Sequence, residues 1–264
     1  MPRLALKFGY NGSSFYGYQR QPGVRTVEGD IISACTKMQA FSEPSEADFA
    51  SASRTDRGVH AIGNVVAFNT DFDPEKLLDG LNANCRDILF HSYLTVVAAF
   101  NPRMATMRHY RYLLYDDVDS AVLNSVLQNF VGSKDFRNFA KSDARGRFRK
   151  IDSIEAHREK ECIVIDFHGR SFLHNMIRRL VAAGLSVTKG LAEEEDITRA
   201  LNGGGPGGFG LAPPQYLILM DVDYGMSFHS VVVKQENAKR WLTGLDTLKT
   251  LEFVEKTLLK SAGL

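Results

Sequence analysis

The chain has 264 residues, of which 44% are hydrophobic and 24% are charged. This is the composition of an ordinary globular protein with enough apolar material for a core. Lys and Arg number 32 and Asp and Glu number 31, so the net charge of +1 excludes a strongly basic nucleic-acid binder. Any nucleic-acid interface must depend on where the charges lie rather than on their sum.

The three cysteines, Cys35, Cys85 and Cys162, lie far apart in the sequence. An odd number of widely spaced cysteines predicts neither a disulfide framework nor a zinc site, and it favours a reducing, cytoplasmic setting. No pair of histidines or cysteines has the spacing of metal ligands. The first eight residues form too short and too polar a run for a signal peptide or a membrane span.

Hydrophobic periodicity and turn residues predict the secondary structure in chain order. The expected strands cover residues 3–10, 47–52, 65–70, 89–98, 110–116, 151–157, 162–168 and 217–222. The expected helices cover residues 26–40, a segment starting near Pro74, and residues 120–131, 171–189, 193–201 and 248–259. Strands and helices mix without strict βαβ order, which predicts an α+β fold. The second part of the chain loosely repeats the first, so we expect two similar halves, residues 1–102 and 103–264.

One polar segment between two expected strands combines several residue types that carry chemistry. Residues 53–61 (SRTDRGVHA) place two arginines, a threonine, an aspartate and a histidine on one short turn. Loops held by strands commonly carry functional side chains, and Gly58 allows a backbone shape that residues with a Cβ resist. The residues alone leave two interpretations open: a functional loop, or a polar turn with a local ion pair between Arg and Asp.

This segment resembles the GRTDAGVHA signature of the TruA-type pseudouridine synthases. The sequence differs from that signature at Ser53, where the family has Gly, and at Arg57, where it has Ala. A charged residue at the second of these positions is typical of archaeal and eukaryotic relatives. The resemblance implies that Asp56 is the catalytic nucleophile and that Arg54 helps to extrude the target nucleotide.

Further segments resemble the same family, in the family's order, over about residues 3–224. They are residues 8–19 (FGYNGSSFYGYQ), 26–28 (TVE), 100–112 (FNPRMATMRHYRY), 135–139 (DFRNF), 172–181 (FLHNMIRRLV) and 212–224 (APPQYLILMDVDY). The resemblance implies that Tyr110 is the active-site aromatic residue and that Arg178 is the ion-pair partner of the nucleophile. It also implies two α+β halves whose antiparallel sheets meet in a central cleft that binds RNA.

The implied activity is the isomerisation of uridine to pseudouridine in the anticodon stem-loop of tRNA, at positions 38, 39 and 40. The family resemblance also implies a homodimer. The reaction needs no cofactor or metal, but it needs an ionised carboxylate that can carry a covalent intermediate, and a neighbouring arginine favours the charged form. The target base must leave its stack, and an aromatic ring such as that of Tyr110 supplies a platform for it. We expect Tyr110 and Tyr112 to lie on alternate faces of a strand, one in the core and one toward the cleft.

A basic segment supports an RNA substrate. Residues 137–180 contain eleven Lys and Arg against six Asp and Glu, a local charge of +5. Arg145, Arg147 and Arg149 cluster in an expected loop and are candidates for phosphate contacts, although a charged run is also typical of a solvated face. His60 follows the polar turn, and we expect it to be a structural hydrogen-bonding residue.

Three other functions compete with this assignment. A relative that binds RNA without catalysis would lack the nucleophile, and Asp56 is present. A glycosidase or nucleosidase normally uses two carboxylates, and the core motif offers one. A synthase that acts on other tRNA positions is the nearest alternative. Residues 225–264 carry no family match and receive no function.

Overall fold

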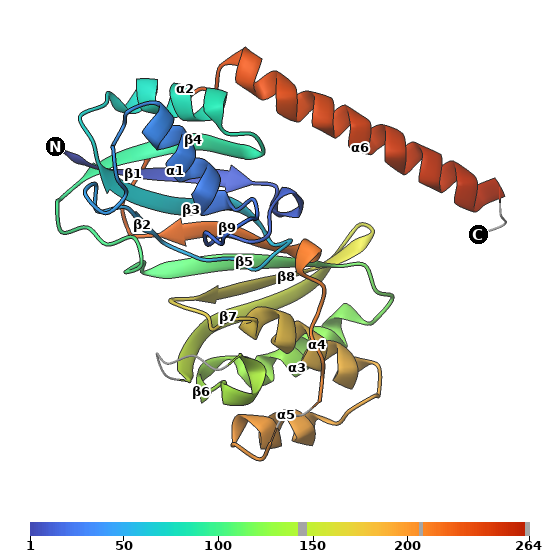
Figure 1. Cartoon of the computed structure of the whole chain (residues 1–264). Coiled ribbons are helices and arrows are strands. Elements are labelled where there is room, and N and C mark those ends of the chain that lie inside the picture. Colours follow the sequence, from blue (N-terminus) through green and yellow to red (C-terminus); the bar gives the residue numbers. More distant parts are fainter. Residues whose placement is uncertain (142–146, 206–207, 262–264) are drawn as a thin grey trace.

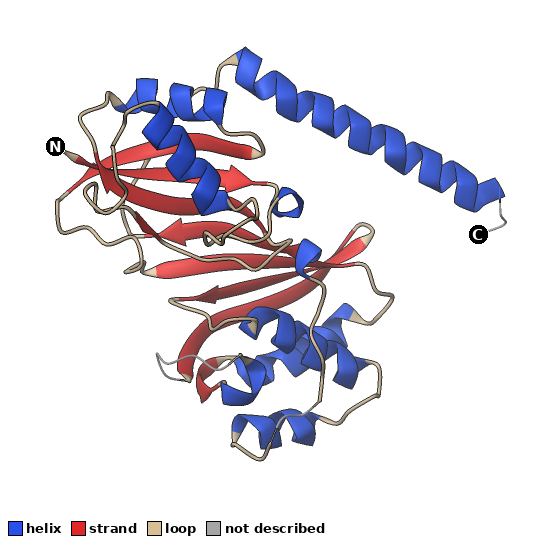
Figure 2. Ribbon diagram, in the orientation of Figure 1, coloured by secondary structure: helices blue, strands red, loops and turns tan. Residues whose placement is uncertain are grey.

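The computed structural model describes residues 1–141, 147–205 and 208–261. Figure 1 shows the elements along the chain, and Figure 2 separates the strands from the helices. The strands are β1 (Arg3–Tyr10), β2 (Ala50–Ser51), β3 (His60–Asn69), β4 (Ile88–Val96), β5 (Met107–Leu114), β6 (Gly132–Asp135), β7 (Phe148–Glu159), β8 (Cys162–Gly169), β9 (Leu217–Asp223) and β10 (His229–Ser230). The α-helices are α1 (Val27–Lys37), α2 (Pro74–Asn84), α3 (Ser120–Leu127), α4 (Met176–Thr188), α5 (Glu194–Leu201) and α6 (Gln235–Ser261).

Local sequence explains where the first helices begin. The Thr26 side chain accepts a hydrogen bond from the backbone N–H of Gly29 and caps α1, while Ile31 and Cys35 bury its apolar face. Asp73 caps α2 in the same way, and Pro74 occupies the first helical turn, where no backbone donor is needed. Both helices lie over the strands of the first half (Figure 1).

All strands of the described residues join one sheet, in the order β10-β4-β1-β3-β9-β5-β8-β7-β6, with β2 paired to β3. Neighbouring strands are antiparallel except at the centre, where β3 and β9 pair in parallel through His60 opposite Ile218 and Ala61 opposite Leu219. The expected α+β class is confirmed. We expected two antiparallel sheets, but β9 lies between β3 and β5 and joins the two antiparallel sets edge to edge into one mixed sheet.

The division at residue 102 stays a proposal. It falls in the segment between β4 and β5, while one core of buried residues contains side chains from both sides of it. The catalytic residues proposed from sequence come from both sides of the junction between β3, β9 and β5, so this junction positions the candidate site.

Several boundaries differ from those expected. Helix α4 begins at Met176 rather than at 171, because Asn175 takes a left-handed conformation (φ 63°) and ends the preceding loop. Strands β6 and β10 were not expected, since β6 reads GSKD and β10 has two residues, without apolar alternation. Helix α6 begins at Gln235 rather than at 248, because its first turns are polar and give no periodic signal.

Helix α6 projects from the body of the protein (Figure 1). Near its beginning Lys234 lies 2.8 Å from Asp79 of α2, and near its end Lys256 lies 3.6 Å from Glu161 in the β7–β8 turn. The helix carries exposed apolar side chains along its length, among them Leu248 and Phe253. No described helix is both long enough and apolar enough to cross a membrane.

Candidate active site

The polar segment 53–59 forms a turn before β3, and the first half of the protein fixes its shape. The Tyr10 and Thr55 hydroxyls are 2.7 Å apart, and the backbone N–H of Tyr18 donates to the carbonyl of Thr55 at 3.1 Å. Gly12 packs so closely on this turn that a Cβ there would lie 2.1 Å from the carbonyl oxygen of Val59. The backbone around Asp56 is therefore held by direct contact with the segment that follows β1.

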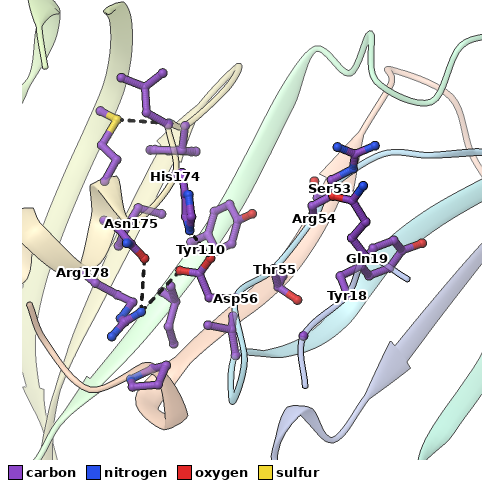
Figure 3. A pocket seen from close by; sticks show the side chains of 18 of the residues that line it. Tyr18, Gln19, Ser53, Arg54, Thr55, Asp56, Tyr110, His174, Asn175 and Arg178 are labelled. Carbon is purple, nitrogen blue, oxygen red and sulfur yellow. Dashed lines mark hydrogen bonds and ion pairs between the residues drawn. The ribbon is translucent and has the colours of Figure 1, made fainter. Parts of the chain in front are cut away.

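The carboxylate of Asp56 meets an arginine and a histidine side chain from the second half (Figure 3). Arg178 donates from Nη1 to Oδ2 at 3.3 Å, and His174 Nε2 lies 3.0 Å from Oδ1. The side chain of Asp56 is one-quarter exposed, so the carboxylate is open on one side while both oxygens have a partner. The expected ion pair between Arg178 and the proposed nucleophile is present.

Burial and two hydrogen bonds fix Arg178 itself. Its side chain is 11% exposed, its Nε donates to the carbonyl of Ala212 at 2.7 Å, and its Nη1 also donates to Asn175 Oδ1 at 3.3 Å. The residue lies in the first turn of α4, next to the buried Ile177. The guanidinium is therefore aimed at Asp56 by the helix, by the segment before β9 and by the left-handed turn at Asn175.

His174 was not assigned a function from the sequence. It belongs to the loop before α4, and its carbonyl accepts from the backbone N–H of Lys141 at 3.0 Å. Its side chain is about half exposed at the pocket, beside Asp56 (Figure 3). A single His in an apolar segment carries no signal of its own, and only the geometry of the left-handed turn brings it to the carboxylate.

Tyr110 lies on β5 and is almost fully buried. Its ring packs edge-on against Phe172, with centroids 5.4 Å apart, and its hydroxyl forms a hydrogen bond with the side chain of Ser53. Burial raises the pKa of Tyr110 above its ordinary value, so the hydroxyl keeps its proton at neutral pH. It can act as a hydrogen-bond donor beside Asp56.

The expectation that Tyr110 and Tyr112 lie on alternate faces was wrong. Residues two apart in a strand share a face, and both tyrosines are buried on the same side of β5. Tyr112 donates to the carbonyl of Pro213 at 3.1 Å, whereas Tyr110 lines the pocket with Asp56. The two tyrosines therefore have different surroundings because they lie at different positions along β5, not because they lie on different faces.

Arg108 is a second residue that sequence analysis missed. Its buried guanidinium donates to Ser53 Oγ at 3.0 Å, to the carbonyl of Ala52 at 2.9 Å and to that of Arg103 at 3.1 Å, and it also donates to the carbonyl of Arg170. Burial lowers its pKa, and neutral oxygens rather than a carboxylate satisfy its donors. Arg108 thus ties β5 to the residues just before Asp56.

The remaining expected residues lie in different surroundings. Arg54 is exposed at the pocket and makes no hydrogen bond or ion pair with the described residues. Arg147 lies 3.1 Å from Asp135, and Arg149 donates to the carbonyl of Phe148 at 2.7 Å. Neither Arg147 nor Arg149 lines the pocket around Asp56, and Arg145 lies outside the described residues. Their contacts with phosphates stay a prediction.

A cavity of about 840 Å³ opens at Asp56. Its lining comes from both halves of the protein: residues 16–19, 21, 51–57 and 59 from the first, and residues 103, 108, 110, 171–178, 214 and 217 from the second. This is within the size range of pockets that take small organic groups, so a single extruded nucleotide fits by volume. Asp56 is the single carboxylate among the described lining residues.

His60 has a structural contact within the described residues. The Nδ1 atom of His60 accepts from the backbone N–H of Gly12 at 3.2 Å, and burial lowers its pKa, which confirms a structural hydrogen-bonding residue. Within the described ranges, no group of three or more His, Cys, Asp or Glu residues has an arrangement that could hold a metal ion.

Comparison with known proteins gives the family. A protein of Thermococcus sibiricus called tRNA pseudouridine synthase A is 38% identical over 264 residues, which cover 98% of this chain and 96% of that protein. A protein of the same name from Methanoculleus marisnigri is 39% identical over 85% of this chain and 84% of its own length. The chain belongs to the tRNA pseudouridine synthase A family.

A family model described as tRNA pseudouridine synthase matches residues 126–225, which contain His174 and Arg178. Membership of the tRNA pseudouridine synthase A family confirms the expected enzyme class, an isomerase. Among solved structures, a crystal structure of a Cbf5-Nop10-Gar1 complex matches 67% of this chain and 45% of that chain, with a TM-score of 0.36 and 15% identity. That likeness is too slight to bear on the assignment.

Proposed function

We propose that this protein converts uridine to pseudouridine in the anticodon stem-loop of tRNA, at positions 38, 39 and 40, with Asp56 as the nucleophile. The observation that carries the proposal is the Asp56 carboxylate, held by Arg178 at 3.3 Å and His174 at 3.0 Å inside a cavity that Tyr110 also lines. Relatives named tRNA pseudouridine synthase A support tRNA as the substrate.

The geometry suits a reaction that breaks one glycosidic bond and forms another. The ionised carboxylate of Asp56 attacks the target nucleotide and carries it as a covalent intermediate while the N–C bond breaks and the uracil turns. The base then rejoins the sugar through carbon 5, which loses its proton, and Asp56 leaves with its electron pair. The guanidinium of Arg178 holds the carboxylate in place when Asp56 attacks and again when it leaves.

The roles of the other residues follow from where they lie. The ring of Tyr110 faces the cavity and offers a stacking surface for the extruded base, while its protonated hydroxyl can donate a hydrogen bond. Arg54 has no partner among the described residues, so its guanidinium is available to fill the place that the extruded base leaves. Arg108 directs four of its five N–H donors at protein oxygens, and it acts by positioning residues 53–59, which we call the nucleophile loop.

The cavity also separates this function from its alternatives. A glycosidase that flanks the bond with two carboxylates needs a second Asp or Glu, and the described lining residues provide Asp56 alone. A non-catalytic RNA-binding relative has no need for a carboxylate that Arg178 and His174 hold in a cavity. Incubation with an unmodified tRNA transcript, followed by mapping of pseudouridine, tests the proposal. Pseudouridine at position 38, 39 or 40 supports the proposal, and pseudouridine at another position favours the alternative synthase. A tRNA without any pseudouridine contradicts the proposal that the protein is catalytic.

We also propose that the protein acts as a homodimer in a reducing cytoplasm. The first part follows the family resemblance, and light scattering at micromolar concentration tests it, since a monomeric mass contradicts it. The second part rests on three free cysteines, two of which are buried and have no disulfide partner.

A further inference from the structure

Tyr16 and Arg57, which we call the rim pair, form a contact at the cavity that the proposed mechanism leaves unused. The guanidinium carbon of Arg57 lies 4.1 Å from the centroid of the Tyr16 ring. Both residues line the cavity, and Arg57 directly follows Asp56 in the chain. Arg57 is also one of the two positions at which the segment 53–61 departs from the family signature.

The backbone fixes the rim pair relative to Asp56. The N–H of Tyr18 donates to the carbonyl of Thr55, and Gly17 has a positive φ of 107°. A Cβ at Gly17 would lie 3.3 Å from the backbone nitrogen of Arg57, so the two loops are in close contact at this point. The rim pair therefore keeps a constant place beside the nucleophile.

The rim pair is exposed, unlike the other tyrosines of this loop. Tyr16 is 51% exposed and Arg57 is also exposed, whereas Tyr10 and Tyr18 are buried and hydrogen-bonded to Thr55 and Ser51. Within the described parts of the chain, Arg57 makes no ion pair or hydrogen bond. An exposed cation–π contact stabilises a fold by only about 0.5–1 kcal/mol, so stability is a weak reason for a large aromatic ring here.

We propose that the rim pair binds the unpaired base of the nucleotide next to the target uridine. This inference rests on the proposed function. A tyrosine ring and a guanidinium plane in contact form an extended flat surface, and unstacked RNA bases pack on both kinds of group. A phosphate contact needs a cation but no ring, so the ring of Tyr16 favours a nucleobase at this site. The site depends on Arg57, because the Ala of the family signature offers no such plane.

An RNA with a fluorescent base tests this directly. The probe is an unmodified tRNA transcript with 2-aminopurine on either side of the uridine that the wild-type protein converts. Binding of the wild type should quench one of the two probes. Tyr16→Leu and Arg57→Gln should lose that quenching and weaken RNA binding about tenfold, in line with one lost base stack. At saturating RNA the rate should change much less. Tyr16→Phe should behave as wild type, because the hydroxyl forms no hydrogen bond with the described residues.

Matched controls and salt dependence separate the outcomes. Tyr115→Leu and Arg240→Gln remove an exposed tyrosine and an exposed arginine outside the cavity, and both should bind as wild type. If Arg57→Gln keeps the quenching but lowers the slope of log affinity against log salt by about one, Arg57 contacts a phosphate and the inference is overturned. Wild-type quenching and affinity in both rim-pair variants overturn it too. A wild type that forms no pseudouridine in this RNA overturns the proposed function, which is a separate readout.

Discussion

Two arginine-rich regions of this protein have opposite surroundings. In the segment from Asp135 to Arg149, the carboxylate of Asp135 accepts from Arg137 and lies 3.1 Å from Arg147. In the nucleophile loop, by contrast, Asp56 takes its cation from Arg178, a residue 122 positions away. Arg54 and Arg57 therefore keep their guanidinium groups free of carboxylates among the described residues.

This difference shows that local charge is a poor guide to an RNA surface. The basic segment has the larger excess of positive charge, yet part of that charge is neutralised within a few residues by Asp135. The nucleophile loop has few charges, but its carboxylate is engaged from a distant helix, so its arginines stay available. The partner of each charge, rather than the number of charges, decides what can reach a phosphate or a base.

The largest effect is expected at the centre of the nucleophile loop. Asp56→Asn keeps the size of the side chain but removes its ability to attack as an anion, so it should form no detectable pseudouridine. It should fold and bind tRNA like wild type, since phosphate contacts dominate affinity. Mass spectrometry of the tRNA and a filter-binding assay measure both. Asp152→Asn, which alters a surface aspartate paired with Lys150, is the control. Turnover by a folded Asp56→Asn protein contradicts the mechanism.

The next largest loss of activity is expected at Arg178, the cation that reaches Asp56 from a distant helix. Arg178→Met removes the group that holds Asp56 Oδ2, and a carboxylate displaced by about 1 Å is expected to lower kcat on the order of 100-fold. Arg199→Met on α5 is a matched control, because its guanidinium pairs with Asp196 outside the cavity. Single-turnover kinetics with saturating enzyme separate this loss from a loss of binding. Wild-type kcat in Arg178→Met would mean that His174 alone positions the carboxylate.

Replacing one arginine from each of the two arginine-rich regions tests whether an arginine without a carboxylate partner matters more for RNA than a paired one. Arg54→Ala should lower kcat/KM about tenfold, the equivalent of about 1.4 kcal/mol of help in extruding the base. Arg147→Ala should change it less than about twofold, because Arg147 is already paired with Asp135. Initial rates at low substrate concentration measure both variants side by side. Equal losses would remove the distinction between the two regions.

The smallest effect is expected at Asp135. Hydrogen bonds from Arg137, and then the nearby charge of Arg147, hold the pKa of Asp135 below its ordinary value. A lowered pKa stabilises the fold above the unfolded-state pKa of about 4, and this stabilisation is lost as the pH falls through the folded-state value. Asp135→Asn should therefore lower the urea midpoint more at pH 6 than at pH 3. It should also steepen the salt dependence of RNA binding, since two arginines are released.

Sequence motifs predicted the ion pair of Asp56 and Arg178 but not the residues that surround it. Asp56, Tyr110 and Arg178 follow from the resemblance, and the structure brings all three to one cavity. His174 could not be recognised, because its position depends on a left-handed turn at Asn175 that no residue pattern announces. Arg108 was missed because three of its four partners are backbone carbonyls, which leave no trace in a sequence.

The sequence predicted the elements that have a local hydrophobic periodicity. It did not predict how strands far apart in the chain pair with one another. Strands β1, β7, β8 and β9 and helices α1, α2 and α5 lie close to their expected ranges. The insertion of β9 between β3 and β5 could not be predicted, because parallel pairing with β3 depends on contacts between segments far apart in the chain. The structure therefore has one sheet where two were expected.

The parallel pairing of β3 with β9 also sets an order in time during protein synthesis. The start of β3, beside the nucleophile loop, gains its β9 neighbour only after about 150 further residues have been made, which takes roughly 10–30 s at ordinary ribosomal rates. During this interval the nascent chain presents an open strand edge of the kind that recruits other chains or chaperones. The two sets of strands are therefore joined late, when β9 has left the ribosome, and a chain truncated before β9 keeps Asp56, Tyr110 and Arg178 but lacks the strand between β3 and β5.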